Sequence, residues 1–190
     1  MTRVIAGTAR GRRLQVPSGL VTRPTADRAR EGLFSSLLSL LELQGARVLD
    51  LYAGSGALGL EALSRGAGSA TLVEDDADAV AVLRANVAEL GLGGAHVVAQ
   101  PVERFLAVDP GLESEQQRYD LALLDPPYDV DVAPVLELLH PWLVAGAVVV
   151  AERRSRGSAL VWPAGYEPVR ERRYGEATLW YAHALLASSL

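Results

Sequence analysis

The chain has 190 residues, of which 49% are hydrophobic, so it can form one domain of ordinary size with a full core. It has no Cys, which excludes disulfides, thiolate metal ligands and thiol catalysis; its three His lie far apart in the sequence, so we expect no metal site. No segment has the length and apolarity of a signal peptide or a membrane span, and we expect a cytoplasmic protein without membrane contact.

The net charge of −5 hides an uneven distribution. All 18 basic residues are Arg, and seven of them fall in the first 30 residues against a single acid. Residues 31–151 hold 5 Arg and 18 acids, a net charge of −13, and six further Arg follow near the C-terminus. Arg suits bidentate contact with phosphate. Basic segments on both sides of an acidic middle therefore favour a nucleic-acid partner, with a solvated basic surface as the alternative.

A basic β-hairpin is predicted at the N-terminus. Residues 3–7 and 12–16 are short strand-like runs, with the turn between them at residues 7–11. Residues 17–24 contain two Pro and one Gly and are predicted to form a loop. A helix is predicted to begin near residues 25–27. Its apolar face consists of residues at helical spacing, namely Leu33, Phe34, Leu37, Leu38 and Leu41.

From residue 47 onwards, buried strands alternate with helices. The strands are predicted at residues 48–51, 70–73, 95–99, 119–124 and 147–152. The helices are predicted at residues 57–65, 77–90, 102–108 and 132–143, and the tail is predicted to form an antiparallel pair at 168–174 and 177–183. This order predicts a Rossmann-like α/β fold with a seven-stranded, mostly parallel sheet and an antiparallel C-terminal strand. We expect two parts, the hairpin and loop at residues 1–24 and the α/β domain at residues 25–190.

A glycine-rich loop follows the first strand of this sheet. Gly54, Gly56 and Gly59 form a G-x-G-x-x-G pattern between a strand and a helix, and Glu74 follows 20 residues after Gly54. The pattern alone is a dinucleotide fingerprint, but S-adenosylmethionine binds in the same fold. Glu74 would accept hydrogen bonds from the ribose hydroxyls of either cofactor.

Asp50, at the end of the strand, distinguishes the two cofactors. Its carboxylate would repel the pyrophosphate of a dinucleotide and attract the ammonium and sulfonium groups of S-adenosylmethionine. At about 4 Å and an effective dielectric constant of about 20, such a contact is worth roughly 4 kcal/mol before desolvation. S-adenosylmethionine is therefore the predicted cofactor. A helix-cap or turn role for Asp50, and a NAD-dependent oxidoreductase, are the alternatives.

The sequence Asp125-Pro126-Pro127-Tyr128 follows the fourth strand and suits chemistry on an exocyclic amino group. The nitrogen of such a group is a poor nucleophile because its lone pair is delocalised into the base. The Asp125 carboxylate and the Pro126 carbonyl can accept its two hydrogens, and the two prolines fix the backbone that presents that carbonyl. Tyr128 offers a face on which an extracted base stacks, worth roughly 1–3 kcal/mol. Asp125 is expected to be ionised and to act as an acceptor; a Pro-rich turn is the alternative.

Together these segments resemble the bacterial 16S rRNA guanine-N2 methyltransferases, a small-subunit family of the D-P-P-Y class, over nearly the whole chain. The resemblance lies in Arg3-Val4-Ile5-Ala6-Gly7, Arg10-Gly11-Arg12-Arg13-Leu14, Arg23-Pro24-Thr25-Ala26-Asp27-Arg28-Ala29-Arg30-Glu31 with Phe34, Val48-Leu49-Asp50-Leu51-Tyr52-Ala53-Gly54-Ser55-Gly56, and the D-P-P-Y segment. The combination of the Arg-Pro-Thr segment, the glycine-rich cofactor stretch and the D-P-P-Y segment is specific to this family. Each motif alone is shared by many methyltransferases.

The resemblance implies a class I S-adenosylmethionine-dependent methyltransferase fold and methyl transfer to the exocyclic N2 of one guanine in 16S rRNA. The substrate would be a 30S subunit or a late assembly particle, and the enzyme would act as a monomer. The hairpin would bind RNA phosphate through Arg10, Arg12 and Arg13, and Arg23 and Arg28 would be further RNA-binding residues. The cofactor would contact Thr25, Asp50, Tyr52, Ala53, Gly54, Gly56, Glu74, Asp75, Gln100 and Val102.

Residues 99–102 depart from the family pattern. Such enzymes often carry a polar residue there for the adenine amino group of the cofactor, and here the sequence is Ala99-Gln100-Pro101-Val102. We expect the side-chain contact to the amino group to be lost or to shift to Gln100, whereas the N–H of Val102 stays available for ring N1 of the adenine. The D-P-P-Y motif does not identify the base, so an adenine-N6 or DNA amino-methyltransferase stays an alternative. An RNA-binding assembly factor is another.

Overall fold

The computed structural model describes residues 2–17, 24–108, 118–127, 129–157 and 159–186, and of residues 24–26 it describes only the backbone. The strands of its main sheet are β3 (Arg47–Leu51), β4 (Ser69–Glu74), β5 (Ala95–Ala99), β6 (Tyr119–Leu124), β7 (Leu143–Arg154), β8 (Tyr166–Tyr174) and β9 (Ala177–Ala184). They lie in the order β5-β4-β3-β6-β7-β9-β8. The strands β3 to β7 are parallel, and β9 runs antiparallel to both of its neighbours. The predicted sheet is therefore confirmed.

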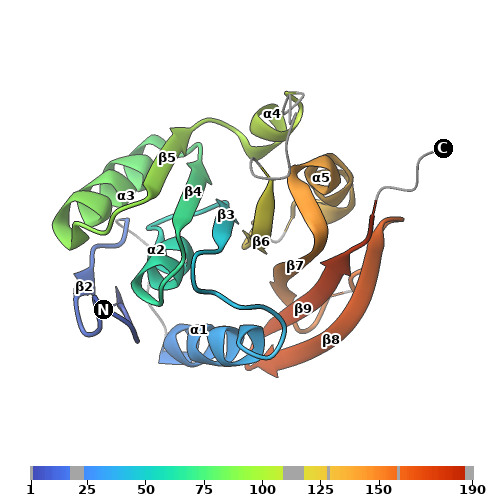
Figure 1. Ribbon diagram of the computed structural model, residues 1–190, viewed down its shortest axis with the longest axis horizontal. Helices are drawn as coiled ribbons and strands as arrows, with labels where there is room; N and C mark the ends of the chain where they lie inside the picture. Colours follow the sequence, from blue (N-terminus) through green and yellow to red (C-terminus); the bar gives the residue numbers. More distant parts are fainter. Residues whose placement is uncertain (1, 18–23, 109–117, 128, 158, 187–190) are drawn as a thin grey trace.

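Helices cover both faces of this sheet (Figure 1). One face packs against α1 (Pro24–Leu37), α2 (Ala57–Ser64) and α3 (Ala77–Leu90), and we call the apolar cluster between them the α1-side core. The other face packs against α4 (Val102–Leu106) and α5 (Val132–Leu139) and forms the α5-side core. Side chains on a strand point alternately to the two faces. Along β3, for example, Val48 lies in the α1-side core, and Leu49 and Leu51 lie in the α5-side core.

The ends of two helices differ from the prediction. The helix expected at residues 132–143 ends at Leu139, and Pro141 lies in the 3₁₀ turn that follows it, η2 (His140–Trp142). The strand β7 then begins at Leu143, four residues earlier than expected. Leu38 was expected on the apolar face of α1, but the helix ends one residue before it and its side chain is 67% exposed.

The predicted N-terminal hairpin is present, with short strands β1 (Thr2–Arg3) and β2 (Arg13–Leu14). Its apolar residues Val4, Ala9 and Leu14 belong to the α1-side core, so the hairpin shares its interior with the α/β domain. The division at residue 24 stays a prediction. No helix in the described ranges is both long and apolar enough to cross a membrane.

Glu61 of α2 fixes the hairpin to the domain. Its side chain is fully buried, and its carboxylate accepts hydrogen bonds from the N–H groups of Ile5 at 2.7 Å and Ala6 at 3.0 Å. Arg65, one turn later, donates to the same carboxylate at 2.6 Å. A buried charge is tolerated when it is paired and hydrogen-bonded in this way. At Gly7 an added Cβ would lie 1.8 Å from the carbonyl oxygen of Ser64, so only Gly fits there.

Candidate active site

The glycine loop after β3 is held in an unusual backbone conformation. Gly54 and Gly56 have φ values of 55° and 81°, and Tyr52 has a φ of 61°, which is uncommon for a residue with a side chain. A Cβ at Gly56 would lie 2.4 Å from Leu83, so the loop packs directly on α3. At Gly54, by contrast, the space where a Cβ would point is open. The loop therefore presents backbone, not side chains, to the space above it at this position.

Asp50 connects the end of β3 to the first turn of α2. Its carboxylate is 1% exposed and accepts a hydrogen bond from the N–H of Gly59 at 2.8 Å. The N-cap residue of α2, Gly56, has no side chain, so Asp50 supplies the missing acceptor. A Cβ at Gly59 would lie 2.7 Å from Leu72 and 3.0 Å from that carboxylate. The helix-cap role considered for Asp50 is thus confirmed, and its contact with a cofactor stays a prediction.

Glu74 organises the loop on the neighbouring strand. One carboxylate oxygen accepts the N–H of Gly54 at 2.7 Å, and the other accepts the N–H groups of Asp75 and Asp76 at 2.9 and 3.0 Å. A carboxylate has about four acceptor sites, so one remains for a ligand hydroxyl. Ala53 is tied to the same strand, because its N–H donates to Val73 at 3.0 Å. The side chain of Asp75 is exposed.

The remaining cofactor candidates lie around this loop. Tyr52 donates its hydroxyl to Glu103 of α4 at 2.9 Å, and burial, with the acceptor Glu103, raises the pKa of that hydroxyl. Gln100 is partly buried, and Val102 is the first residue of α4, where an N–H has no partner within the helix. Thr25 lies in the first turn of α1, and its side chain is outside the described part of the chain.

Four neighbouring strands each bring one carboxylate to the carboxyl edge of the sheet. We call these residues the acidic row: Glu74, Asp50, Asp125 and Glu152. Asp50 is paired with Leu72 on β4 and with Leu123 on β6, and Leu123 is paired with Val150 on β7. These three partners line the α1-side core, so Asp50 points to that face. The other three acids are each two residues beyond one of the partners and point to the same face.

Asp125 lies between Asp50 and Glu152 in this row, because β6 lies between β3 and β7. Its N–H donates to the carbonyl of Leu51 at 3.4 Å, which continues the pairing of β6 with β3 by one residue. The side chain is open to solvent at the sheet edge, yet protein surrounds it on the other sides, and this desolvation raises the pKa of its carboxyl. Pro126 is buried and Pro127 exposed, and Tyr128 lies outside the described residues.

Burial also acts on Asp50 and Glu152. Burial raises the pKa of Asp50 to about 7; the hydrogen bond from Gly59 opposes this shift, and the charges of Asp125 and Glu74 add to it. Burial and the charge of Asp125 raise the pKa of Glu152. A nearby cation or hydrogen-bond donors would favour the ionised forms of Asp50, Asp125 and Glu152.

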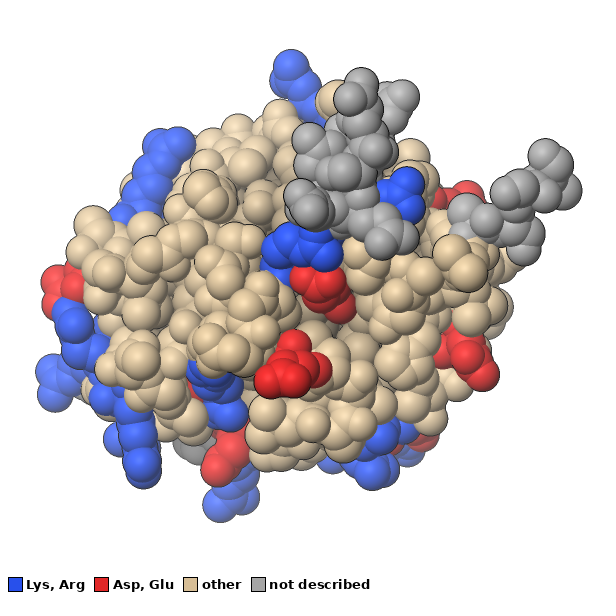
Figure 2. All heavy atoms as spheres, viewed as in Figure 1, with Lys and Arg blue, Asp and Glu red and all other residues tan. Residues whose placement is uncertain are grey.

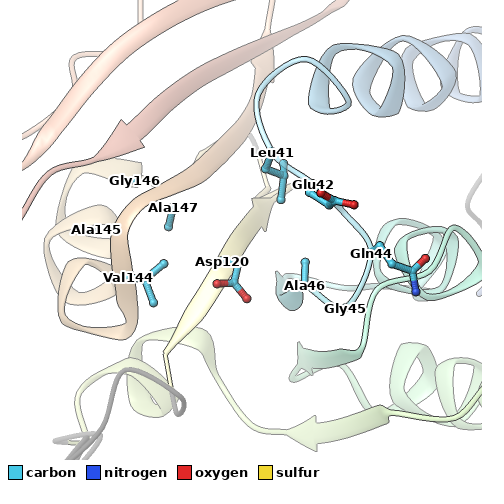
Figure 3. A pocket seen from close by; sticks show the side chains of 10 residues that line it. All are labelled: Leu41, Glu42, Gln44, Gly45, Ala46, Asp120, Val144, Ala145, Gly146 and Ala147. Carbon is cyan, nitrogen blue, oxygen red and sulfur yellow. The ribbon is translucent and has the colours of Figure 1, made fainter.

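A hollow lies at the opposite ends of the strands, and its acid on β6 is paired with an Arg, unlike the acids of the acidic row (Figure 3). It measures about 350 Å³ and lies at the amino ends of β3, β6 and β7. Its one residue on β6, Asp120, forms an ion pair with Arg47 at 2.8 Å, which lowers the pKa of that carboxyl. In the described ranges, no three His, Asp or Glu side chains are placed to hold a metal ion.

The described members of the predicted RNA-binding set are exposed. Arg10, Arg12 and Arg13 of the hairpin are exposed, and basic side chains gather at the left edge of the view in Figure 2, where Figure 1 places the hairpin. Arg12 also forms an ion pair with Glu89 of α3 at 3.5 Å. Arg28 on α1 is exposed, and Arg23 is outside the described residues.

Asn86 of α3 is a site residue that the sequence reasoning missed. Its amide nitrogen donates to the carbonyls of Ser55 at 2.9 Å and Gln15 at 3.0 Å, and its amide oxygen accepts the N–H of Gln15 at 2.8 Å. Asn86 is 1% exposed and links the end of the hairpin to the glycine loop. Its helical spacing from the buried Leu83 and Leu90 was the only signal in the sequence.

Comparison with known proteins identifies the family. The model of the family described as "Conserved hypothetical protein 95" matches residues 2–183. The chain belongs to this family. It is 37% identical to the Ribosomal RNA small subunit methyltransferase D of Escherichia coli K12, over 92% of the chain and 85% of that protein. It is 34% identical to the protein of the same name from Haemophilus influenzae, over 91% and 89%. The resemblance to small-subunit rRNA methyltransferases is thereby confirmed.

Solved structures of similar proteins share the fold. A putative methyltransferase from Escherichia coli superposes with a TM-score of 0.82 at 36% identity, covering 97% of this chain and 98% of its own. A Thermus thermophilus protein described as hypothetical superposes with a TM-score of 0.78 at 38% identity, covering 95% and 98%. The Rossmann-like class I methyltransferase fold expected from the sequence is therefore confirmed.

Proposed function

We propose that the chain transfers a methyl group from S-adenosylmethionine to the exocyclic N2 of a guanine in 16S rRNA. The observation that carries this proposal is the position of Asp125, one residue beyond β6 and adjacent to the glycine loop of β3. Asp125 thus lies beside the place where this fold binds its cofactor. The names of the Escherichia coli and Haemophilus influenzae relatives support methylation of small-subunit rRNA.

The acidic row supports S-adenosylmethionine over a dinucleotide. The N-terminus of α2, where a pyrophosphate would bind, already receives the Asp50 carboxylate at Gly59. A second anion there would be repelled, whereas the ammonium and sulfonium groups of S-adenosylmethionine would be attracted. Gly54 leaves open space above the loop, and Glu74 retains an acceptor for a ribose hydroxyl. When bound, the cofactor supplies an electrophilic methyl group on a positively charged sulfur.

The residues of the chain then prepare the amine. The Asp125 carboxylate and the Pro126 carbonyl accept the two amino hydrogens, which favours a tetrahedral nitrogen with its lone pair directed at the methyl carbon. S-adenosylmethionine held at the glycine loop and Glu74 would supply the methyl carbon to this nitrogen, and its sulfur would leave with the electron pair of the carbon–sulfur bond. The nitrogen loses one proton, which Asp125 can accept and pass to water because its side chain is open to solvent. Tyr128 would stack on the base.

The hairpin is the proposed RNA contact. Its exposed Arg10, Arg12 and Arg13 suit the phosphate backbone, and Arg23 and Arg28 would extend this surface. A single domain with one small hairpin offers little surface for selecting one guanine. We therefore propose a 30S subunit or a late assembly particle as the substrate, with the protein acting as a monomer in the cytoplasm.

Methyl transfer by the Asp125→Ala and Asp125→Asn variants tests the proposal. Particles and naked rRNA from a strain lacking the enzyme would be methylated, digested and analysed for modified nucleosides by mass spectrometry. We expect N2-methylguanosine from the wild type and a loss of kcat of at least about a hundred-fold in both variants. The affinities for RNA and S-adenosylmethionine should stay within about two-fold.

Three outcomes would contradict this function. N6-methyladenosine in the digest would identify an adenine enzyme, and binding of NADH without binding of S-adenosylmethionine would identify an oxidoreductase. Full methylation by both Asp125 variants would show that the amine is held elsewhere. The Glu167→Gln variant, altered at an exposed position of β8, serves as the control and should methylate normally.

A further inference from the structure

Glu152 stands next to Asp125 on the neighbouring strand. Leu124 of β6 is paired with Ala151 of β7, so the next residues along the two strands are Asp125 and Glu152. Both side chains point to the face of the α1-side core, because Leu123 and Val150 two residues earlier line that core. Neighbouring strands are about 4.8 Å apart. Glu152 is therefore an acceptor one strand away from the group proposed to hold the amine.

The carboxylate of Glu152 has no partner in the part of the chain that the structure describes. Among the described residues it forms no hydrogen bond or ion pair, although it is partly buried. At the other end of β6 the situation is different, since Asp120 receives three hydrogen bonds from Arg47. A partly buried carboxylate without a partner carries a desolvation cost. That cost is offset when a ligand supplies donors, and Glu152 faces the proposed base site.

The base edges differ at the position next to the amine. In guanine, the amino group at N2 is followed by the N1–H donor and then by the O6 acceptor. In adenine, the amino group at N6 is followed by the N1 acceptor and then by a C–H group. In cytosine, the amino group at N4 is followed by the N3 acceptor. Enzymes that flip a base out of its stack read this edge by hydrogen bonds. An acceptor beside the amine site therefore suits guanine alone.

We propose that Glu152 selects guanine by accepting the N1–H of the target base, an inference that rests on the proposed guanine-N2 activity. The nearby charge of Asp125 and burial favour the neutral form of Glu152. The neutral acid keeps a carbonyl oxygen for N1–H, and its O–H can donate to O6. Guanine thus satisfies both groups of the acid, whereas adenine offers at most one contact. Sites built for such a donor reject analogues that lack it.

Base analogues test this selection without altering the protein. The target guanine in a reconstituted particle would be replaced by 2-aminopurine, which keeps the 2-amino group but has an acceptor at N1 and no O6. We expect the wild type to methylate this particle with a kcat/KM at least about a hundred-fold below that for guanine. Equal rates on the two bases would overturn the role of Glu152.

The Glu152→Gln and Glu152→Leu variants add a test of the residue itself. The amide of Gln keeps both the acceptor for N1–H and a donor for O6, so Glu152→Gln should keep the preference for guanine within about two-fold. Glu152→Leu has neither group, so its preference for guanine should fall by at least about ten-fold, mainly through loss on guanine. The Glu167→Gln control on β8 should keep the wild-type preference. If Glu152→Leu lowers both rates equally, the residue is structural and the inference fails. If the wild type forms no N2-methylguanosine on the unmodified particle, the proposed function fails instead.

Discussion

The carboxylate of Asp50 and the backbone N–H of Gly59 are joined by a 2.8 Å hydrogen bond that spans the whole glycine loop. The bond fixes the end of β3 to the first turn of α2, where the N-cap residue Gly56 has no side chain to offer. The same carboxylate belongs to the acidic row. The cap needs only an oxygen atom, whereas the proposed attraction of Asp50 for the cofactor would need a charge.

Substitution of Asp50 by Asn and by Ala should separate these roles. Asn retains an oxygen for Gly59, so Asp50→Asn should change the free energy of unfolding by less than about 1 kcal/mol, whereas Asp50→Ala should cost about 1–3 kcal/mol because the N–H is left unpaired. Both variants should bind S-adenosylmethionine at least about ten-fold more weakly. Urea unfolding and calorimetry measure the two quantities. Unchanged cofactor affinity in Asp50→Asn would leave the cap as the only role.

The stability of the ligand-free protein should fall as the pH rises. Burial raises the pKa of Asp50 from its ordinary 3.8 to about 7, and the pKa values of Asp125 and Glu152 shift in the same direction. The folded state therefore holds protons that the unfolded state releases. The resulting stability is fully present below about pH 4 and is lost as the pH rises towards 7.

Thermal unfolding between pH 5 and pH 8 checks this expectation. The Tm should be lower at pH 8 than at pH 5, and the difference should shrink in Asp50→Asn. It should also shrink with bound S-adenosylmethionine, because a nearby cation favours the ionised carboxylates. A Tm that rises with pH over this range would contradict the assignment. Asp120 has a lowered pKa, so its opposite contribution appears only in more acidic solution.

Even an isosteric substitution of Asn86 should lower the free energy of unfolding. In Asn86→Ala the N–H of Gln15 and two carbonyls lose their partners, which should cost about 2–4 kcal/mol. In Asn86→Asp the carboxylate faces the carbonyls of Gln15 and Ser55, so we expect at least the same loss. Urea unfolding measures both. An unchanged free energy of unfolding in Asn86→Asp would show that the amide of Asn86 does not hold the glycine loop. Arg84→Ala, at an exposed position of the same helix, is the control.

The hairpin Arg residues should determine the salt dependence of RNA binding. Log affinity decreases linearly with log salt concentration. For every phosphate that a variant no longer binds, this slope should become shallower by about 0.7–0.9. Arg10→Ala and Arg13→Ala should show this more fully than Arg12→Ala, because Arg12 already interacts with Glu89. Filter binding over a salt series measures the slope. Glu89→Ala is the matched control and should not weaken binding. An unchanged slope in the Arg10 and Arg13 variants would place the RNA elsewhere.

Patterns within short segments predicted most of the fold. The α3 and β5 bounds follow from periodicity and from Gly91, and those of β6 from its apolar run before Asp125. The ends of α1 and α5 did not follow, because they depend on where the packing surface stops. Leu38 has the right spacing but no sheet beneath it, and Pro141 shapes the chain only after the helix has ended.

Some residues of the candidate site could be predicted from the sequence, and others could not. Residues within a motif, such as Asp50 and Asp125, could be found from the sequence because strand ends in a parallel sheet meet at one edge. Glu152 and Asn86 could not. Glu152 is 27 residues from Asp125, and only the register of β6 with β7 brings the two together. Asn86 depends on a contact with Gln15 across 71 residues.

Glu61 constrains how such a protein can acquire a new RNA target. The carboxylate at the centre of α2 depends on the N–H groups of Ile5 and Ala6, and the helix that carries it begins at the end of the glycine loop. Removing the first residues of the chain would leave that charge buried with only Arg65 as its partner. Because the donors are backbone N–H groups, the N-terminal segment can change exposed side chains such as Arg10 and Arg13 but must keep the backbone course that brings these two groups to Glu61.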